Sequence, residues 1–227
     1  MKFGVVIFPG SNCDKDMIYV LSNILKQEVV ELWHKDRDLK QCDFIILPGG
    51  FSFGDYLRSG AIAKFSPIMQ EIITFANNGG YVLGVCNGFQ ILTESGLLPG
   101  ALIHNNSHKF ICKNIFLKTI SKSTKITSLY KDEAIKIPIA HGEGKYFADE
   151  KTLQSLAEND QILFKYSDVN GKINNESNPN GSSNNIAGVC NENRNVFGMM
   201  PHPERAADIE LKNTDGLILF KSILENI

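Results

Sequence analysis

The sequence predicts an α/β fold with a mostly parallel central sheet flanked by helices. The chain has 227 residues, of which 43% are hydrophobic and 21% charged, and this is enough apolar side chain for one sizeable core. In the first half, short apolar runs alternate with segments of helical periodicity, a pattern typical of right-handed βαβ units. Glycine and proline follow several of the apolar runs, as they follow buried strands. We therefore expect a single domain over residues 1–227.

The first half supplies the parallel part of the predicted sheet. Phe3 to Phe8 is an apolar run that stops at Pro9-Gly10, as a buried strand would. Apolar residues then recur on one helical face, at positions 17, 20, 21, 24 and 25. The other predicted elements of this half are strands at Glu28–Trp33, Asp43–Leu47 and Tyr81–Val85, and helices at Pro67–Ala76 and Asn87–Glu94.

The second half is less regular and predicts an additional region of antiparallel strands. A run rich in Asn, Ser and Gly, residues 170–185, reads as a loop or turn region. The predicted strands are Phe110–Ile120, Ala134–Ala140, Ile162–Tyr166, Ile186–Cys190 and Asn195–Met199, and the predicted helices are Asp149–Glu158 and Leu217–Ile227.

Charge and hydropathy exclude several classes of protein. The net charge of −2 gives no general attraction to nucleic acid or to anionic membranes, and no apolar run approaches the length of a membrane helix. The apolar part of the N-terminus is too short for a signal peptide. The five cysteines are an odd number without a CxxC pair, which argues against a disulfide framework or a structural zinc site. We expect a cytoplasmic protein with reduced thiols.

One cysteine lies at a predicted strand-to-helix corner. Gly84-Val85-Cys86-Asn87-Gly88 follows an apolar strand and begins a helix, which is the pattern of a nucleophile elbow with Cys at its tip. The small residues at 84 and 88 allow the backbone to pass close to its neighbours. The helix N-terminus favours the thiolate, so Cys86 is a candidate nucleophile rather than an inert core thiol.

His202-Pro203-Glu204 is the candidate base and its orienting carboxylate. Pro203 disfavours a helical conformation at His202, so we expect an extended segment in which residues two apart point the same way. The imidazole and the carboxylate would then lie side by side. A surface His beside a surface Glu is the alternative, but the pair follows a predicted strand of the same sheet.

The oxyanion of an acyl-transfer reaction needs hydrogen-bond donors. Gly49, Gly50 and Phe51 follow a predicted strand, where a glycine pair leaves backbone N–H groups able to turn toward a ligand. The N–H of Asn87, next to the nucleophile, is the second candidate donor. A plain turn between strand and helix would also account for the glycine pair.

Other motifs fare less well. His104 and His108 are four residues apart without a third ligand nearby, so we expect no metal site. The segment beginning at Gly142 lacks the first glycine and the Ser/Thr of a P-loop, and no GxGxxG begins the first helix. Cys13 follows the end of a predicted strand but lacks the spacing of a nucleophile elbow, so we expect it to have no catalytic role.

Together, these residues resemble a known family. Gly84-Val85-Cys86-Asn87-Gly88-Phe89-Gln90, with His202-Pro203-Glu204 far downstream, is similar to the class I (triad) glutamine amidotransferases, whose fold is flavodoxin-like. Longer segments resemble more narrowly the family of glutaminase subunits that serve phosphoribosylformylglycinamidine synthase. These segments are residues 48–58, 140–144, 178–182 with 185–188, and 198–206.

The resemblance implies a role for each motif residue. Cys86, His202 and Glu204 would form the catalytic triad that hydrolyses glutamine to glutamate and ammonia through a thioester. Asn87 and Gln90 would help to hold glutamine, as would residues 105–110, of which Asn105 and Phe110 are the named candidates.

The resemblance also implies partners. The chain has no recognisable ATP site, so ammonia would go to a large synthetase subunit that carries ATP, Mg²⁺ and formylglycinamide ribonucleotide. A small third subunit would bridge the two, and the isolated chain would have low activity. The chain itself would hold no cofactor and no metal, and would bind neither nucleic acid nor membrane. The alternatives are a Cys hydrolase of a related flavodoxin-like fold, and a catalytically silent module that regulates a synthetase.

Overall fold

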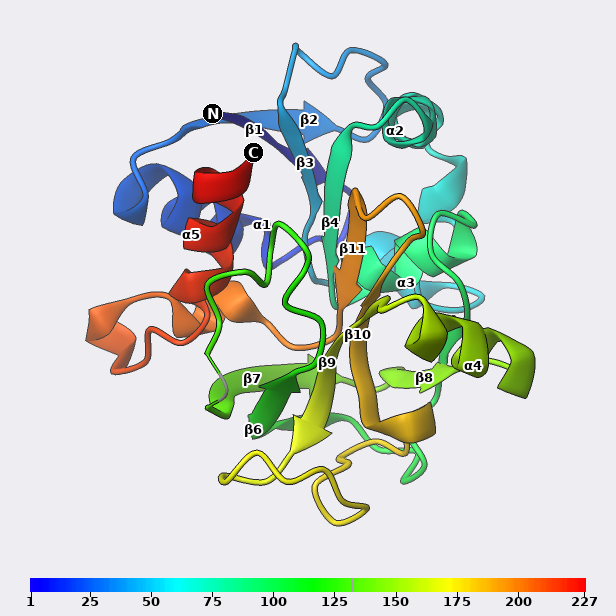
Figure 1. The fold of residues 1–227 in the computed structure, drawn as a ribbon. Helices are drawn as coiled ribbons and strands as arrows, with labels where there is room; N and C mark the ends of the chain where they lie inside the picture. The colour runs from blue at the N-terminus through cyan, green and yellow to red at the C-terminus, as the bar shows by residue number, and fades with distance from the viewer. Residues whose placement is uncertain (132) are drawn as a thin grey trace. The chain divides into compact units, whose positions relative to one another are not determined.

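The computed structural model describes residues 1–131 and 133–227 (Figure 1). Its chain divides into two compact units. The first unit comprises residues 1–98 and 195–198, and the second comprises residues 99–194 and 199–227. The prediction of one domain over 1–227 stays a prediction.

The first unit contains the parallel strands that the sequence predicts. Its strands are β1 (Lys2–Ile7), β2 (Glu28–Trp33), β3 (Phe44–Leu47) and β4 (Tyr81–Val85), and it also holds residues 196–198 of β11 (Val196–Met199). β1 lies between β2 and β3, and β4 follows β3, with all three pairings parallel. All four residues of β3 are buried, so this strand is covered on both faces and reads as an uninterrupted apolar run.

The helices of the first unit begin and end near the predicted residues. They are α1 (Asp14–Tyr19), α2 (Pro67–Asn77) and α3 (Asn87–Glu94). Pro67 is the first residue of α2, where its missing N–H costs no hydrogen bond. The helix predicted from positions 17–25 continues beyond α1 as a π-helical segment, Val20–Ile24. The chain is therefore helical there, but with more residues per turn than the 3.6 that the prediction assumes.

The second unit contains the antiparallel region. β9 (Ile162–Ser167) pairs antiparallel with β10 (Ile186–Cys190) and with β6 (Ile111–Thr119), and β6 pairs antiparallel with β7 (Ile135–His141). Its helices are α4 (Glu150–Glu158) and α5 (Leu217–Asn226). Two three-residue strands that the sequence analysis missed, β5 (Ala101–Ile103) and β8 (Lys145–Phe147), pair with each other, because runs so short carry no periodicity.

In the part of the chain that the structure describes, no helix has both the length and the apolar character needed to cross a membrane.

Candidate active site

Cys86 lies at the tight corner that the sequence predicts, between the end of β4 and the first residue of α3. Its backbone has φ 51° and ψ −107°, a conformation that a residue with a side chain rarely adopts. Such strain persists only where the surroundings enforce it, and it is common at nucleophile elbows. The residue is buried, with 5% of its surface exposed.

The small neighbours at positions 84 and 88 are needed, as predicted. A Cβ at Gly84 would lie 2.6 Å from backbone atoms of Gly88, and a Cβ at Gly88 would overlap the carbonyl oxygen of Leu47. Glycine is thus required on both sides of Cys86 because α3 passes this close to β3 and β4.

Asn87 and Gln90 stand together on the first turn of α3. The side-chain amide of Asn87 donates to Gln90 Oε1 at 2.9 Å and accepts from the backbone N–H of Ser52 at 3.2 Å. A longer contact of 3.4 Å joins Asn87 to Asp55. These bonds fix the segment that follows β3 against α3, a role that the sequence analysis did not anticipate for Ser52 and Asp55.

Of the glycine pair after β3, Gly50 has a positive φ and is closely packed. Gly50 has φ 142°, and a Cβ there would lie 2.8 Å from the N of Asn12. The N–H of Phe51 donates to the carbonyl of Gly10 at 3.0 Å, and the carbonyl of Gly49 accepts from Cys13 at 3.3 Å. Because the Phe51 N–H is occupied, the N–H of Gly50 is the better candidate for an oxyanion donor.

His202 and Glu204 form a buried pair in the second unit. His202 Nδ1 lies 2.7 Å from Glu204 Oε1, and the two side chains are 1% and 0% exposed. The backbone N–H of His202 donates to the carbonyl of Pro138 on β7 at 2.9 Å, which anchors the residue to the edge of the sheet. A carboxylate on Nδ1 fixes the ring so that Nε2 is the nitrogen left for proton transfer.

The route by which the two side chains meet differs from the prediction. The segment is not extended beyond His202: residues Pro203–Ala206 form a 3₁₀ turn. Proline suits the first position of such a turn because its φ is already set and its missing N–H is not needed there. The expected pairing of the imidazole with the carboxylate is correct, but the turn, rather than the alternation of a strand, produces it.

Asn105 is fully engaged inside the second unit. Its Nδ2 donates to the carbonyls of Lys109 and His141, both at 2.9 Å. Its Oδ1 accepts from Gly144 N and faces His141 Nδ1, both at 3.1 Å. With every side-chain hydrogen-bonding site used and 0% of its surface exposed, Asn105 positions the loop that precedes Phe110, and its role in holding glutamine stays a prediction.

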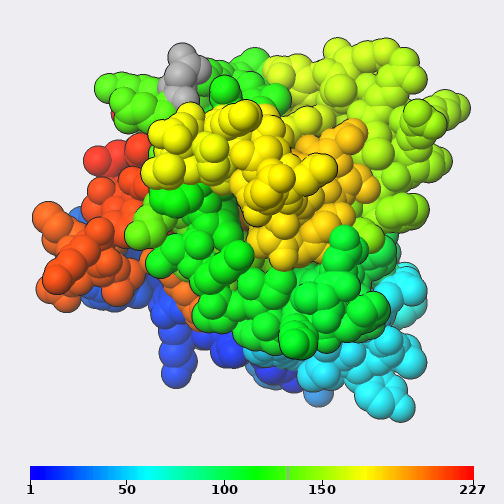
Figure 2. Space-filling view, turned by 90° about the horizontal axis from the view of Figure 1, so that it is seen from below, coloured from blue at the N-terminus to red at the C-terminus, as the bar shows by residue number. Residues whose placement is uncertain are grey.

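The Asn-rich segment is part of the same network, which the sequence analysis missed. Asn180 Nδ2 donates to the carbonyl of Gly144 at 2.7 Å, and Ser182 Oγ accepts from Tyr146 N at 3.0 Å. Asn178 Oδ1 in turn accepts from the backbone of Gly181 at 2.9 Å. In Figure 2 the yellow spheres of this part of the chain lie against green ones. The backbone N–H of Asn106 donates to Asn180 O at 3.0 Å. The sequence clue is the Asn-Pro-Asn-Gly-Ser run, which by itself predicts only a turn.

The candidate site residues thus divide between the two units. Cys86 and the candidates Gly49, Gly50, Phe51, Asn87 and Gln90 are carried by the first unit, whereas His202, Glu204, Asn105 and Phe110 are carried by the second. The nucleophile and its candidate base therefore belong to different units, and their approach to each other is part of the proposal below. Phe110 is 54% exposed and Phe51 is 43% exposed.

His141, the last residue of β7, makes the stability of the fold depend on pH. Burial of the ring, together with the charge of nearby His202, lowers the pKa of His141 from 6.5 to about 4. Between these values the unfolded chain binds more protons than the folded one, so stability falls as the pH drops through this window. We expect the free energy of unfolding to decrease by up to about 3 kcal/mol from pH 6.5 to pH 4 on account of this group.

The measurement is urea unfolding of the wild-type protein and of His141→Asn at several pH values from 4 to 7. The variant should show a shallower dependence on pH than the wild type, and His104→Asn, a change at an exposed histidine, is the matched control for loss of an imidazole. His34, whose pKa burial also lowers, acts in the same direction and remains in both variants. An unchanged slope in His141→Asn would contradict the assignment.

Comparison with known proteins gives a consistent picture. The family model of the CobB/CobQ-like glutamine amidotransferase domain matches residues 1–216. The chain is 56% identical over 225 residues to the phosphoribosylformylglycinamidine synthase subunit PurQ of Koribacter versatilis, covering 99% of this chain and 97% of that one. It is 57% identical over 222 residues to the subunit PurQ of Synechocystis, covering 97% of this chain and 99% of that one.

Solved structures agree in fold. The structure of PurLQS from Thermotoga maritima contains a chain with a TM-score of 0.86 and 44% identity, covering 99% of this chain and 97% of that one. A glutamine amidotransferase from the same organism has a TM-score of 0.58 at 14% identity, covering 100% of this chain and 91% of that one, which shows a shared fold alone. The predicted fold class is confirmed, and the chain belongs to the CobB/CobQ-like glutamine amidotransferase family.

Proposed function

We propose that the chain is the glutaminase subunit of phosphoribosylformylglycinamidine synthase and releases ammonia from L-glutamine for purine biosynthesis. The observation that carries the proposal is the strained Cys86 at the head of α3, in a chain that also holds the buried His202–Glu204 pair. The relatives at 56% and 57% identity are named as this subunit, and the match to this chain covers nearly their whole length. Both facts support the narrower assignment.

In the proposed reaction, Cys86 approaches His202, whose Nε2 accepts the thiol proton. The thiolate adds to the side-chain amide carbon of glutamine, and the backbone N–H groups of Gly50 and Asn87 stabilise the oxyanion. The protonated His202 then gives its proton to the departing nitrogen, because an amide anion is too poor a leaving group. Ammonia leaves, and a γ-glutamyl thioester on Cys86 remains.

Water completes the cycle. His202 accepts a proton from a water molecule as its oxygen attacks the thioester, and the thiol of Cys86 recovers a proton when glutamate leaves. Glu204 orients the imidazole and stabilises its charged form in both halves of the reaction. The sum of the two halves is glutamine plus water giving glutamate plus ammonia, so no cofactor is needed in this chain.

The ammonia must reach a second chain that activates the acceptor amide. We assign this step to a large synthetase subunit with ATP and Mg²⁺, and we assign the link between the two chains to a small bridging subunit. The likeness to a chain of the PurLQS structure supports this assembly. We place the protein in the cytoplasm, since the cysteines that the structure describes are all free thiols.

The test is purification of the chain with the synthetase chain from the same source, followed by an assay of glutamine-dependent amidation of formylglycinamide ribonucleotide. We expect synthesis that depends on glutamine and ATP, and glutaminase turnover that rises when the synthetase chain is added. Release of glutamate without any amidated product, whatever chain is added, would contradict the proposal and favour a simple hydrolase. No turnover and no labelling by a glutamine-like electrophile would favour a silent regulatory module.

A further inference from the structure

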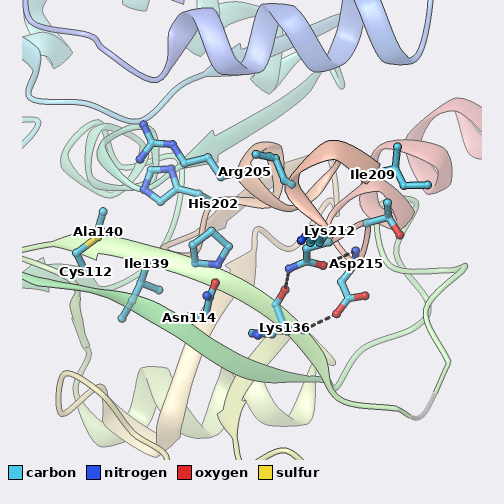
Figure 3. Close-up of a pocket in the computed structure, with 14 residues that line it drawn as sticks. Cys112, Asn114, Lys136, Ile139, Ala140, His202, Arg205, Ile209, Lys212 and Asp215 are labelled. Atoms are coloured by element: carbon cyan, nitrogen blue, oxygen red, sulfur yellow. Dashed lines mark hydrogen bonds between the residues drawn. The ribbon is translucent and has the colours of Figure 1, made fainter.

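The second unit has a cavity of about 1010 Å³ beside His202. Figure 3 shows it between the β6–β7 hairpin, which contributes Cys112 and Ile139, and the segment after His202, which contributes Arg205 and Lys212. The proposed reaction does not use this space, apart from the presence of His202 in its wall.

Two apolar side chains at the rim of the cavity are exposed to solvent. Ile209 and Leu211, which both line it, are 81% and 58% exposed. They belong to a 3₁₀ turn, Ile209–Leu211, in which Asp208 Oδ1 accepts from Glu210 N at 3.0 Å. The turn is closed by a backbone bridge between Asp208 and Asn213. Because the turn is held in place, binding a partner there costs little ordering entropy.

The residues that line the cavity carry an excess of positive charge. Lys136, Arg205 and Lys212 face a single lining carboxylate, Asp215, which already accepts from the backbone N–H of Lys136 at 2.7 Å. Asp208 and Glu210 belong to the rim turn but do not line the cavity. An acidic segment with apolar side chains would complement this surface in charge and in hydrophobicity.

The rim turn is tied to the catalytic pair through its base. Gly216 N donates to the carbonyl of Ala206 at 2.7 Å, and this bond closes residues 207–215 into a loop. The loop begins directly after the 3₁₀ turn that contains Glu204. A Cβ at Gly216 would overlap the carbonyl oxygen of Pro203, which shows how tightly the base is packed. A partner bound to the rim would therefore act next to His202 and Glu204.

We propose that the cavity and its Ile209–Leu211 rim, together the docking cleft, bind an acidic, apolar-containing segment of the large synthetase chain. This inference rests on the proposed function, because only an ammonia-releasing chain needs a partner beside the histidine that protonates the departing nitrogen. A partner seated on the docking cleft would receive ammonia at the wall formed by His202 and would keep it from bulk water.

The test compares two docking-cleft variants with two matched controls. The double variant Ile209→Ser with Leu211→Ser removes the apolar rim, and Lys212→Glu reverses one lining charge. The controls are Val169→Ser, at an apolar residue that is 62% exposed, and Lys151→Glu on α4; neither position lines the cavity. Each purified protein is titrated with the synthetase chain from the same source, and both binding and glutaminase turnover are followed.

We expect the rim variant to raise the synthetase concentration needed for half-maximal binding by about tenfold or more, as loss of two apolar anchors does. Lys212→Glu should raise it several-fold and weaken its dependence on salt. Turnover without the partner and the thermal midpoint should match the wild-type values, and the controls should bind normally.

Normal binding by both docking-cleft variants would overturn this inference while leaving the proposed function intact. The inference would also be overturned if the control variants bound the synthetase chain as weakly as the docking-cleft variants do. It would likewise be overturned if the docking-cleft variants lost binding only to a small bridging chain and kept binding to the synthetase chain. If the wild-type protein neither binds the synthetase chain nor supports amidation with it, the proposed function fails and the docking cleft fails with it.

Discussion

Replacement of Cys86 by alanine should abolish glutamine hydrolysis while leaving ammonia-dependent synthesis in the assembled complex unchanged. Without the sulfur no thioester can form, so turnover with glutamine should fall by about 10⁴-fold or more. Ammonia supplied as an ammonium salt bypasses the chain, so the synthetase should still make product at the wild-type rate. Steady-state assays with glutamine and with ammonium chloride measure the two activities in the same preparation.

The controls are alanine variants of two other buried thiols. Burial raises the pKa of Cys42 to about 11 and that of Cys190 to about 12, so both are thiols rather than thiolates near neutral pH. Cys42→Ala and Cys190→Ala should therefore keep glutaminase turnover. A glutamine-like diazo-ketone should label Cys86 alone, as seen by peptide mass spectrometry.

Two outcomes would contradict the role of Cys86 as the nucleophile. If Cys86→Ala lost both the glutamine and the ammonia activity, the residue would be needed for the fold or for assembly rather than for chemistry. If the variant kept glutamine turnover, the thioester mechanism would be wrong.

Replacement of His202 by asparagine should be nearly as damaging as loss of the nucleophile. His202 is the proposed acid for the departing nitrogen, and the members of a catalytic unit act together rather than additively. We expect kcat for glutamine to fall by about 10⁴-fold or more, with a much smaller change in KM. In Glu204→Gln, kcat should fall less, by about 10²–10⁴-fold, because the substitution removes the charge that orients the ring but keeps the ring itself.

Activity against pH separates this role from a structural one. The residual activity of His202→Asn should lose the wild-type dependence on the protonation of a base, whereas a variant that is merely destabilised would keep the profile at a lower amplitude. Thermal unfolding of each variant checks the fold, and His104→Asn, at a histidine whose side chain is 68% exposed, should behave as wild type. A wild-type kcat in His202→Asn would rule out the proposed acid.

Local features of the chain were readable from the sequence because they depend on nearby residues. The parallel strands follow from short apolar runs, and β1 and β3, whose runs stop at Pro9 and Pro48, lie where those runs predict. The strand-to-helix corner at Cys86 follows from small residues on both sides, and the structure explains that requirement by the close approach of α3 to Leu47 and Gly84. The two three-residue strands, β5 and β8, could not be predicted from the sequence because three residues are too few to show an alternation of apolar and polar side chains.

The geometry of the His202–Glu204 pair was predictable only in part. The spacing of His202 and Glu204 predicts that the side chains meet, and they do, at 2.7 Å. The expected extended backbone was wrong, since Pro203 begins a 3₁₀ turn instead. The preference of proline for a fixed φ is compatible with both conformations, so only packing of the segment against β7 could decide between them.

By itself, the sequence determined the fold class, and it predicted the nucleophile and the residues that form its candidate base, because these follow from local pattern and from resemblance. Only the tertiary structure decided what distant segments do to each other. It showed that Asn105, His141, Gly144 and Asn180 form one network, and that the positively lined docking cleft joins β6 and β7 to the segment after His202. Contacts between residues 30 or more positions apart depend on how side chains pack, and no local preference of the chain encodes them.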